Sequence, residues 1–446
     1  MSQRRHPGSR PAGKPQKAKT ALPKAPMTLT VSGLGAQGDG LARHGETPVF
    51  IAGALPGETV TVRASGKKGD GLAAELIAVE TASAERVEPP CPHYSACGGC
   101  SLQHYAPAAE ADWKRDILRQ TLRARGLDPA VVEPVIRIGA GTRQRATFAW
   151  RRLRDRVVLG YNQRASHQIT DLQTCLLLEA PLSALLPALR GLVAAVAPVG
   201  SMGDLSVTLT DSGADLCLDL PDYPGLEALE QIGLWAEAHA AARIGAQIDG
   251  VYHPLLTPRA PLVRFDGASV DLPPQMFLQP SRAGADALLA AVRAALTGTE
   301  GPLLDLFCGL GTFALPLAGD GRTVRGFDSE STAIAALSRA AKALKRPLTA
   351  TVRDLFRDPV EGKELKDVTT VVLDPPRAGA DAQCRALAEP AGASVRRVVM
   401  VSCSPATFAR DARTLCDGGF RLMQVVPVDQ FVWSPHLELV ARFERG

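Results

Sequence analysis

The chain has 446 residues, of which 46% are hydrophobic and 22% charged, an ordinary composition for a globular protein. This length predicts about three domains, each large enough for a core of its own. No apolar stretch reaches the ~18 residues that a membrane-spanning helix needs, so an integral membrane protein is not expected. Nine cysteines without a secretory signal predict a cytoplasmic, reducing location, where thiols bind metals or act as nucleophiles more often than they form disulfides.

The formal net charge of +4 is unevenly distributed along the chain. Residues 1–26 hold seven lysines and arginines, five prolines and no acid, which leaves the rest of the chain at −3. Such a segment cannot bury apolar surface, so we expect it to be disordered. It either attracts polyanions such as RNA or serves only as a solubilising tail.

Residues 27–83 consist of short alternating runs such as TLTVSGLG and ETVTVRASG, separated by glycine turns. About four or five strands at this spacing predict a small β-barrel. The segment resembles a TRAM domain, an OB-like RNA-binding module. Arg63, Lys67 and Lys68 are candidates for phosphate contacts, although isolated basic residues are usually only solvated.

The segment CPHYSACGGC places Cys91, Cys97 and Cys100 within ten residues, and its Gly-Gly pair allows the backbone to fold tightly around a bulky group. Clustered thiolates in a reducing compartment bind zinc or an iron–sulfur cluster. Cys175 is the best candidate for a fourth ligand. The spacing differs from that of common zinc ribbons, and by itself it leaves zinc and a cluster both open.

Residues 84–270 mix strands and helices and predict a central α+β domain that carries the cysteines and contacts RNA. Apolar residues at helical spacing predict a helix over residues 107–126, with a packing role and the catalytic domain as one candidate partner. A hairpin is expected to turn at residues 211–213. The run RQRATFAWRR predicts a strand whose arginines either contact RNA phosphates or are merely solvated; these are Arg143, Arg145, Arg151 and Arg152.

Residues 271–446 alternate strands with helices, a rhythm that predicts a parallel sheet covered on both faces. The last two strands, near 420–427 and 436–443, have no helix between them and predict an antiparallel ending. This is the seven-stranded, Rossmann-like arrangement of S-adenosylmethionine-dependent methyltransferases, so the overall fold class is α/β. The other five strands are expected at residues 303–307, 323–327, 348–353, 369–374 and 397–402.

Three motifs fall at strand ends in this last domain, where ligands collect in open α/β sheets. DLFCGLGTF runs a strand into a glycine turn that is too short for a dinucleotide fingerprint and lacks the lysine of a P-loop. Asp328 ends the second strand, where a carboxylate can grip ribose hydroxyls. LDPPR ends a strand at Asp374, and VSCSP places Cys403 at the end of another.

With CPHYSACGGC and PHLEL, these motifs make residues 27–446 resemble the RNA (uracil-5-)-methyltransferase family, and within it the 23S ribosomal RNA branch that carries a TRAM domain and an iron–sulfur cluster. The resemblance implies that Cys403 is the nucleophile and Glu438 the base. It further implies a 4Fe–4S cluster on Cys91, Cys97, Cys100 and Cys175, and S-adenosylmethionine contacts from Gln279, Phe307, Thr312, Asp328, Asp354 and Asp374. At Thr312, Asp328 and Ser281 many members carry asparagine, glutamate and asparagine, respectively.

The implied chemistry needs a thiol and a base together, because uracil C5 is a poor carbon nucleophile. Addition of a thiolate at C6 makes C5 electron-rich, after which C5 accepts a methyl group, loses its proton to a base and releases the thiol. The target base must leave its stack to reach the thiol.

Several other functions are weighed against this one. An RNA 5-methylcytosine methyltransferase would carry a second cysteine beside the proline at Asp374-Pro375-Pro376, and an exocyclic-amine methyltransferase would carry Asn-Pro-Pro-Tyr there. A non-catalytic RNA-binding iron–sulfur protein would have no use for a thiol, a base and a cofactor pocket in one chain. Transfer RNA is the alternative substrate, and neither an obligate protein partner nor a membrane is expected.

Overall fold

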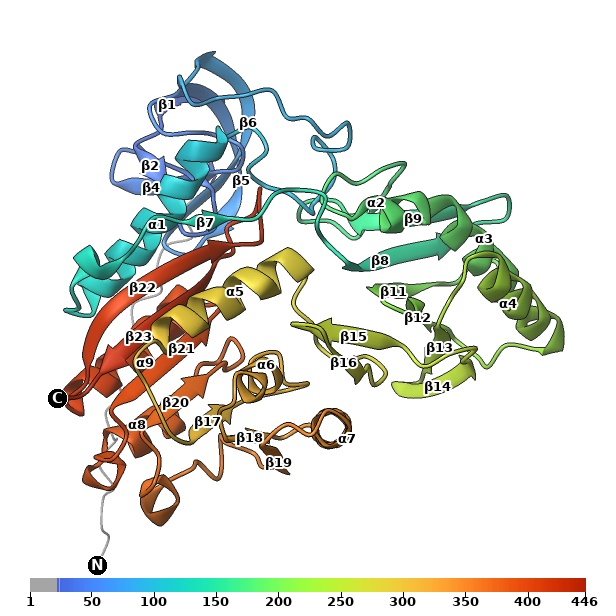
Figure 1. The fold of residues 1–446 in the computed structure, drawn as a ribbon. Coiled ribbons are helices and arrows are strands. Elements are labelled where there is room, and N and C mark those ends of the chain that lie inside the picture. The colour runs from blue at the N-terminus through green and yellow to red at the C-terminus, as the bar shows by residue number, and fades with distance from the viewer. Residues whose placement is uncertain (1–21, 24) are drawn as a thin grey trace, which may run out of the picture. The chain divides into compact units, whose positions relative to one another are not determined.

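The computed structural model describes residues 22, 23 and 25–446, so the basic segment 1–26 lies almost wholly outside the described residues. The chain divides into two compact units with their boundary between Ala84 and Glu85 (Figure 1). Within the described part of the chain, no helix is long and apolar enough to cross a membrane.

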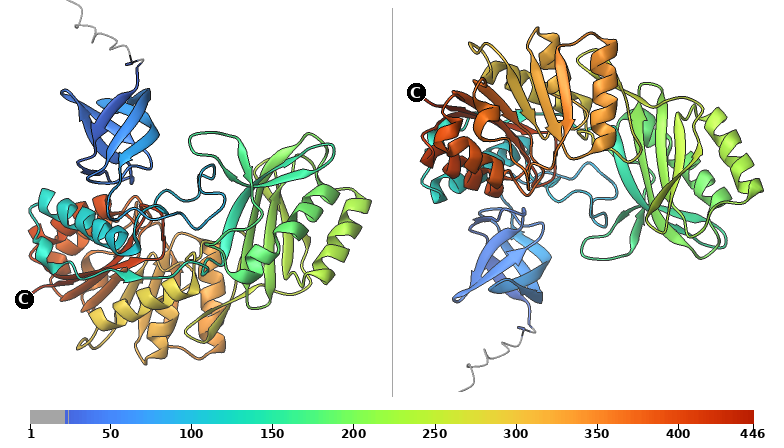
Figure 2. Two further views of the ribbon diagram at one scale, coloured as in Figure 1. Left: turned by 90° about the horizontal axis from the view of Figure 1, so that it is seen from above. Right: turned by 90° about the horizontal axis from the view of Figure 1, so that it is seen from below.

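The first unit is a six-stranded sheet in the order β1-β5-β6-β4-β3-β2, curled into a barrel (Figure 2). Alternate strand residues such as Val49, Ile51, Val60 and Val62 are fully buried and form its core. The sequence predicted four or five strands for this unit, and the structure has six, one of them only two residues long. The strands are β1 (Met27–Thr30), β2 (Gly33–Leu34), β3 (Gly40–His44), β4 (Thr47–Ile51), β5 (Thr59–Lys68) and β6 (Gly71–Thr81).

The second unit begins with a cysteine-containing loop and α1 (Pro107–Ala124), followed by the short helix η1 (Pro129–Val131) and β7 (Ile136–Arg137). A seven-stranded sheet follows in the order β10-β9-β8-β11-β12-β13-β14. The predicted hairpin is confirmed, since β11 and β12 pair in antiparallel register up to Thr210 and Gly213. The strands are β8 (Arg145–Arg152), β9 (Val157–Asn162), β10 (Ile169–Asp171), β11 (Met202–Thr210), β12 (Gly213–Asp219), β13 (Arg243–Ile248) and β14 (Val251–Leu256).

The amphipathic helices α3 and α4 cover this sheet. Leu189 and Val193 of α3 share a core with Phe148 and Trp150 of β8. A separate hairpin then leads out of the sheet, and its buried residues Val263 and Phe265 join the core of the C-terminal domain. The elements are α2 (Ala180–Ala184), α3 (Leu186–Val196), α4 (Leu226–Ala238), β15 (Leu262–Phe265) and β16 (Ala268–Asp271).

The C-terminal sheet has the strand order β19-β18-β17-β20-β21-β23-β22-β7. β17 to β21 are parallel, whereas β23 is antiparallel to both of its neighbours, as predicted for a methyltransferase fold. β7 adds an eighth strand that the sequence did not predict, because two residues carry no pattern. The strands are β17 (Leu303–Leu306), β18 (Val324–Asp328), β19 (Leu348–Val352), β20 (Thr370–Leu373), β21 (Arg397–Ser402), β22 (Arg421–Asp429) and β23 (Glu438–Glu444).

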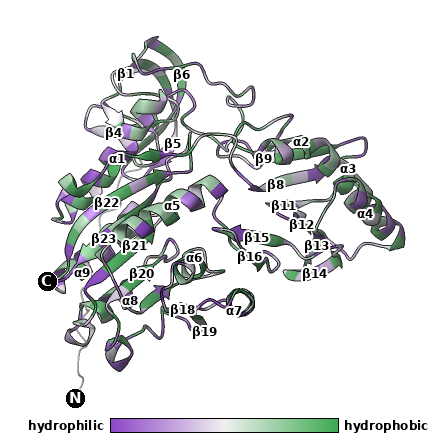
Figure 3. Cartoon of the chain, viewed as in Figure 1, coloured by the Kyte–Doolittle hydropathy of each residue, from purple (hydrophilic) through white to green (hydrophobic). Residues whose placement is uncertain are grey.

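Helices cover both faces of this sheet because successive strand residues point to opposite sides. In β21, Val399 and Val401 face α5 and α7, whereas Val398 and Met400 face α1, α8 and α9. Figure 3 shows β20 and β21 coloured as strongly hydrophobic, as expected for strands buried on both faces. The helices are α5 (Arg282–Ala295), α6 (Ala314–Gly319), α7 (Ser331–Ala343), η2 (Gly362–Leu365), α8 (Asp381–Ala388), η3 (Pro390–Gly392) and α9 (Pro405–Asp417).

Candidate active site and cysteine-lined cavity

Five of the predicted site residues lie at one edge of the C-terminal sheet. Phe307, Asp374 and Cys403 directly follow β17, β20 and β21, while Asp328 ends β18 and Asp354 lies two residues beyond β19. Since these strands are parallel neighbours, their carboxyl ends meet at the same edge. Residues scattered over almost a hundred positions of sequence are therefore gathered at a single edge.

The glycine turn after β17 is built for a close backbone approach. Phe307 has a φ of 65°, and Gly311 has a φ of 89°, where a Cβ would stand 2.4 Å from a methyl carbon of Leu337. Asp328 holds this turn, because its Oδ2 accepts a hydrogen bond of 2.9 Å from the backbone N–H of Gly309. A hydrogen bond therefore links the glycine turn to Asp328, the two features that were predicted to bind the same cofactor.

The remaining predicted cofactor residues occupy different surroundings. Gln279 and Thr312 border a cleft of about 470 Å³ that also touches α5 and the β15–β16 hairpin. Gln279 is buried, and its Oε1 accepts a hydrogen bond of 2.7 Å from Gln430 Nε2. Asp354 is half-buried, accepts from the N–H of Phe356 at 3.0 Å, and stands 3.4 Å from Arg357.

Cys403 and Glu438 face each other across two antiparallel strands. Ser402 pairs with Leu439, so the next position along β21 stands opposite Glu438, the first residue of β23. Cys403 is half-buried, and directly after it Ser404 caps α9 by accepting from the N–H of Thr407 at 3.5 Å. The positive end of a helix favours an anion at this position.

The surroundings of these two groups hold protons on both. Burial raises the pKa of Glu438 to about 8, with Asp374 adding to the rise and Arg377 opposing it. Burial also raises the pKa of the Cys403 thiol, and the negative charges of Glu438 and Asp374 act in the same direction. The positive charge of Arg377 favours the ionised forms of both groups. Burial and the nearby Asp328 raise the pKa of Asp374 itself to about 7.

Arg377 is a site residue whose role the sequence did not predict. It ends the LDPPR motif, and its Nη2 lies 3.4 Å from Nδ1 of His436. The available signal was its place directly after the two prolines that follow Asp374, but only the fold shows that this position lies near a thiol and an acid.

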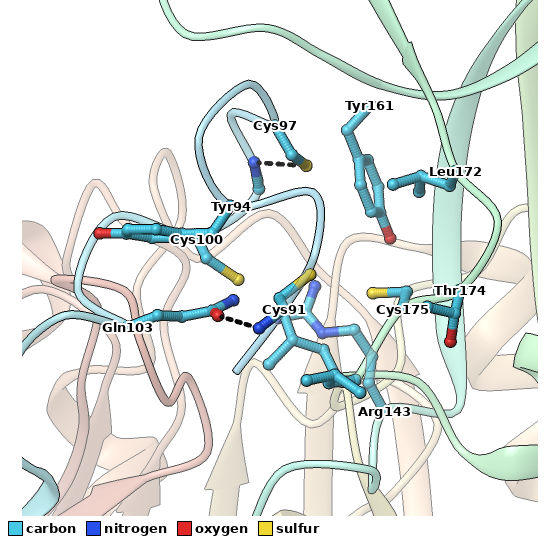
Figure 4. Close-up of a pocket in the computed structure, with 13 residues that line it drawn as sticks. Cys91, Tyr94, Cys97, Cys100, Gln103, Arg143, Tyr161, Leu172, Thr174 and Cys175 are labelled. Carbon is cyan, nitrogen blue, oxygen red and sulfur yellow. Dashed lines mark hydrogen bonds between the residues drawn. The ribbon is translucent and has the colours of Figure 1, made fainter. Parts of the chain in front are cut away.

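The four predicted metal-ligating cysteines line one cavity of about 80 Å³, several times the space that one water molecule needs (Figure 4). Three of them come from the loop before α1, and Cys175 approaches from the segment after β10. Gly98 permits this approach, since a Cβ there would lie 2.6 Å from the carbonyl oxygen of Asn162. Tyr161 and Arg143 are among the other residues of the wall, and neither was predicted to take part.

The thiols surround a space without converging on one point. Among residues 22, 23 and 25–446, no three His, Cys, Asp or Glu side chains are grouped closely enough to hold a single metal ion. Burial raises the pKa of Cys97 and Cys175, and raises that of Cys100 to about 12, with the neighbouring thiols adding to the rise. Buried thiols whose pKa is raised ionise together only around a compensating positive charge.

Comparison with known proteins identifies both the C-terminal domain and the N-terminal barrel. A family model described as tRNA (Uracil-5-)-methyltransferase matches residues 270–445, and a TRAM domain model matches residues 26–76. An uncharacterized RNA methyltransferase of Rhizobium meliloti is 39% identical over 429 residues, covering 94% of this chain and 99% of the relative. The 23S rRNA (uracil(1939)-C(5))-methyltransferase RlmD of Shewanella baltica is 32% identical, covering 94% and 96%, respectively.

A solved structure shares the fold. The tRNA (uracil-54, C5)-methyltransferase of Pyrococcus abyssi, crystallised with S-adenosyl-L-homocysteine, superposes with a TM-score of 0.72 at 21% identity, covering 94% of this chain and all of that one. The strand order and the strand-end motifs define an S-adenosylmethionine-dependent methyltransferase. The sequence matches cover almost the whole chain and establish its family. The chain belongs to the RNA (uracil-5-)-methyltransferase family and carries a TRAM domain.

Proposed function

We propose that the protein methylates C5 of a uridine in 23S ribosomal RNA, with Cys403 as nucleophile and Glu438 as base. The observation that carries this assignment is the pairing of β21 with β23, which sets a half-buried thiol opposite a buried carboxylic acid at the ligand-binding edge of the sheet. The relative from Shewanella baltica, which matches almost the whole chain, supports ribosomal RNA as the substrate class. The family model is described for tRNA, which makes transfer RNA the second candidate.

The reaction follows from the two groups. The Cys403 sulfur bonds to C6 of the flipped uracil, and the electron pair of the C5=C6 double bond moves into an enolate. Bound S-adenosylmethionine would supply the methyl group: as C5 bonds to the methyl carbon, the bond from that carbon to the sulfonium sulfur would break and leave S-adenosylhomocysteine. Glu438 accepts the C5 proton, the C5=C6 double bond re-forms, and the C6–sulfur bond breaks to return the thiolate.

The raised pKa values at the site favour the proton removal but oppose the thiol attack. A carboxylate whose pKa lies near 8 is a stronger base than an ordinary glutamate, which favours removal of a proton from carbon. The thiol, by contrast, must ionise against burial and two nearby acids, so Arg377 is the residue that promotes its attack. Exclusion of water from the site therefore helps the late step, through Glu438, and hinders the first step, through Cys403.

The methyl donor is assigned to the carboxyl edge beside this pair. Phe307 and the glycine turn would border the adenosine, Asp328 would bind the ribose hydroxyls, and Asp374 would lie nearest the reacting groups. Gln279, Thr312 and Asp354 would complete the contacts from the two flanks. The shared cleft beside Gln279 and Thr312 supports this role for those two residues.

The cavity lined by Cys91, Cys97, Cys100 and Cys175 is assigned to a 4Fe–4S cluster. Its four thiols and its size support the assignment. Methyl transfer to carbon exchanges no electron, so the cluster would supply structural order to the loop before α1 and to the segment after β10. RNA contacts are assigned to the TRAM unit and to the arginines of β8.

The test uses RNA fragments that carry 5-fluorouridine, because fluorine cannot leave as a cation and the covalent complex is trapped. Wild type is expected to form a denaturant-resistant protein–RNA band, and Cys403→Ala to form none. Cys416→Ala, which removes another half-buried thiol on the next helix, is the matched control and should behave as wild type. An adduct with Cys403→Ala would refute the nucleophile and make Cys308 the next candidate.

The base and the substrate are tested with ordinary uridine. Glu438→Gln should add, methylate and then stall, so a methylated adduct accumulates. Turnover at the wild-type rate without an adduct would assign the base to another residue. Mapping 5-methyluridine in ribosomal and transfer RNA from cells that lack the protein separates the two substrate classes, since only the true substrate loses a site.

A further inference from the structure

The segment that delivers Glu438 to the active site runs from Gln430 to Leu437 and joins β22 to β23. It has no regular secondary structure that would hold it in place. Its centre, Trp433, has a φ of 63°, an unfavourable left-handed conformation for a bulky residue. Such a conformation persists only where surrounding contacts enforce it, so the contacts of Trp433 identify what positions this segment.

One set of contacts comes from α1. Glu110 is fully buried, and its Oε1 accepts a hydrogen bond of 2.7 Å from the backbone N–H of Trp433. Lys114, one turn further, donates to the carbonyl oxygen of Phe431 at 3.1 Å and to Asp429 Oδ2 at 2.7 Å. Two charged side chains of α1 therefore hold the backbone of the segment at Phe431 and at Trp433.

A second set comes from the cysteine-containing loop. The backbone N–H groups of Ser101 and Leu102, which directly follow Cys100, donate to the carbonyl oxygen of Trp433 at 2.8 and 3.1 Å. Arg143, which also lines the cavity, has its guanidinium 5.9 Å from the ring centre of Phe431. Trp433 is thus held through its N–H by α1 and through its C=O by the loop that carries three cysteines.

The contacts from α1 belong to a network of buried charges. Glu110, Lys114 and Asp429 are all removed from water, with Arg137 closing the network by a 2.6 Å contact to Glu110 Oε2. Apolar residues of similar size would often stabilise such a site equally well. A carboxylate that accepts a backbone N–H instead fixes that peptide in one orientation.

We propose that Glu110 is a positioning residue for the base, acting through Trp433, and that the Ser101–Leu102 backbone is its counterpart from the cysteine loop. The inference rests on the proposed role of Glu438. Without Glu110, the N–H of Trp433 loses its acceptor. The left-handed conformation is then held only through the carbonyl hydrogen bonds from Ser101 and Leu102 among the two sets of contacts described above. Glu438 then moves relative to C5, whereas Cys403, which lies between β21 and α9, keeps its place.

The proposal predicts a specific kinetic defect. In Glu110→Ala, thiol addition and methyl transfer continue but proton removal slows, so kcat falls on the order of 100-fold while KM for RNA stays unchanged. The methylated adduct accumulates, as in Glu438→Gln. Glu110→Gln keeps an oxygen acceptor for Trp433 and should recover most of the rate. Asp116→Ala, an exposed acid on the same helix, is the matched control and should behave as wild type.

Hydrogen exchange followed by mass spectrometry gives a readout independent of activity. Peptides that cover residues 430–437 and 101–102 should exchange faster in Glu110→Ala than in Asp116→Ala, whereas peptides from α9 should not change. Unchanged exchange in 430–437 would overturn the proposal, as would a loss of active protein without an adduct, which indicates simple destabilisation. If Glu438→Gln itself gives no adduct, the assignment of the base fails, and the exchange comparison alone decides whether Glu110 holds the segment.

Discussion

Replacing Glu438 by glutamine should change how the protein's stability depends on pH. Burial raises the pKa of this carboxyl from the 4.5 of an ordinary glutamate to about 8 in the folded protein. Between these values the folded state binds the proton and the unfolded state releases it. The free energy of unfolding therefore falls as pH rises through this window. Glutamine has the shape of the protonated acid and cannot titrate, so the variant does not show this decrease.

The size of the effect follows from the shift. Each pH unit inside the window costs the wild type up to about 1.4 kcal/mol, and the decrease diminishes near the folded pKa, which gives roughly 2 kcal/mol between pH 6 and pH 8. Asp374, whose pKa is also raised, is present in both proteins and does not enter the difference. For a large domain, this free energy corresponds to a difference of roughly 4 °C in Tm.

Thermal melts of wild type and Glu438→Gln at several pH values test this reasoning. The Tm advantage of the variant should widen from pH 6 to pH 8. Glu444→Gln is the control on the same strand, because its carboxylate reaches solvent and Arg397 and its charge is not buried. A difference that stays constant with pH, or that narrows, would show that Glu438 does not hold a proton in the folded protein.

Three further predictions address other parts of the molecule. Anaerobically purified protein should contain about four irons and four sulfides per chain and lose them in Cys175→Ser, whereas stoichiometric zinc would contradict the cluster. Deleting residues 1–26 should flatten the salt dependence of RNA binding, by about 0.7 in the slope of log K against log salt for each phosphate that the tail neutralises, and an unchanged slope would leave the tail as a solubiliser. Arg377→Gln should raise the pKa of Cys403 and slow its alkylation by iodoacetamide near neutral pH, whereas the exposed Arg385→Gln should not.

Much of the C-terminal domain could be predicted, because short stretches of its sequence identify individual strands and their ends. Apolar runs that end in Asp374 or Cys403 identify buried parallel strands, and parallel strands bring their ends to one edge. The pairing of Cys403 with Glu438 is different in kind. It depends on an antiparallel register between segments more than thirty residues apart, which no local pattern specifies, and only the family resemblance pointed to Glu438.

The partners of α1 could not be predicted for a related reason. Its apolar stripe, with Leu118 and Leu122, indicates that one face is buried but not against what. In the sequence, Glu110 and Lys114 resemble solvent-facing charges, and their burial depends on Asp429, more than three hundred positions away. Likewise, the spacing of Cys91, Cys97 and Cys100 indicated thiols that act together, whereas the cavity that they line with Cys175 arises from the fold around it.

The site also shows why one residue cannot be optimised for both halves of the proposed reaction. Burying Glu438 raises its basicity for proton removal, yet its negative charge and the exclusion of water make the neighbouring thiol harder to ionise. Arg377 lowers the pKa of both groups, so a stronger arginine interaction would speed the first step while weakening the base. In the absence of RNA this balance favours the protonated thiol, so the first step depends on Arg377 and on the electrophilic C6 that an entering uracil would present.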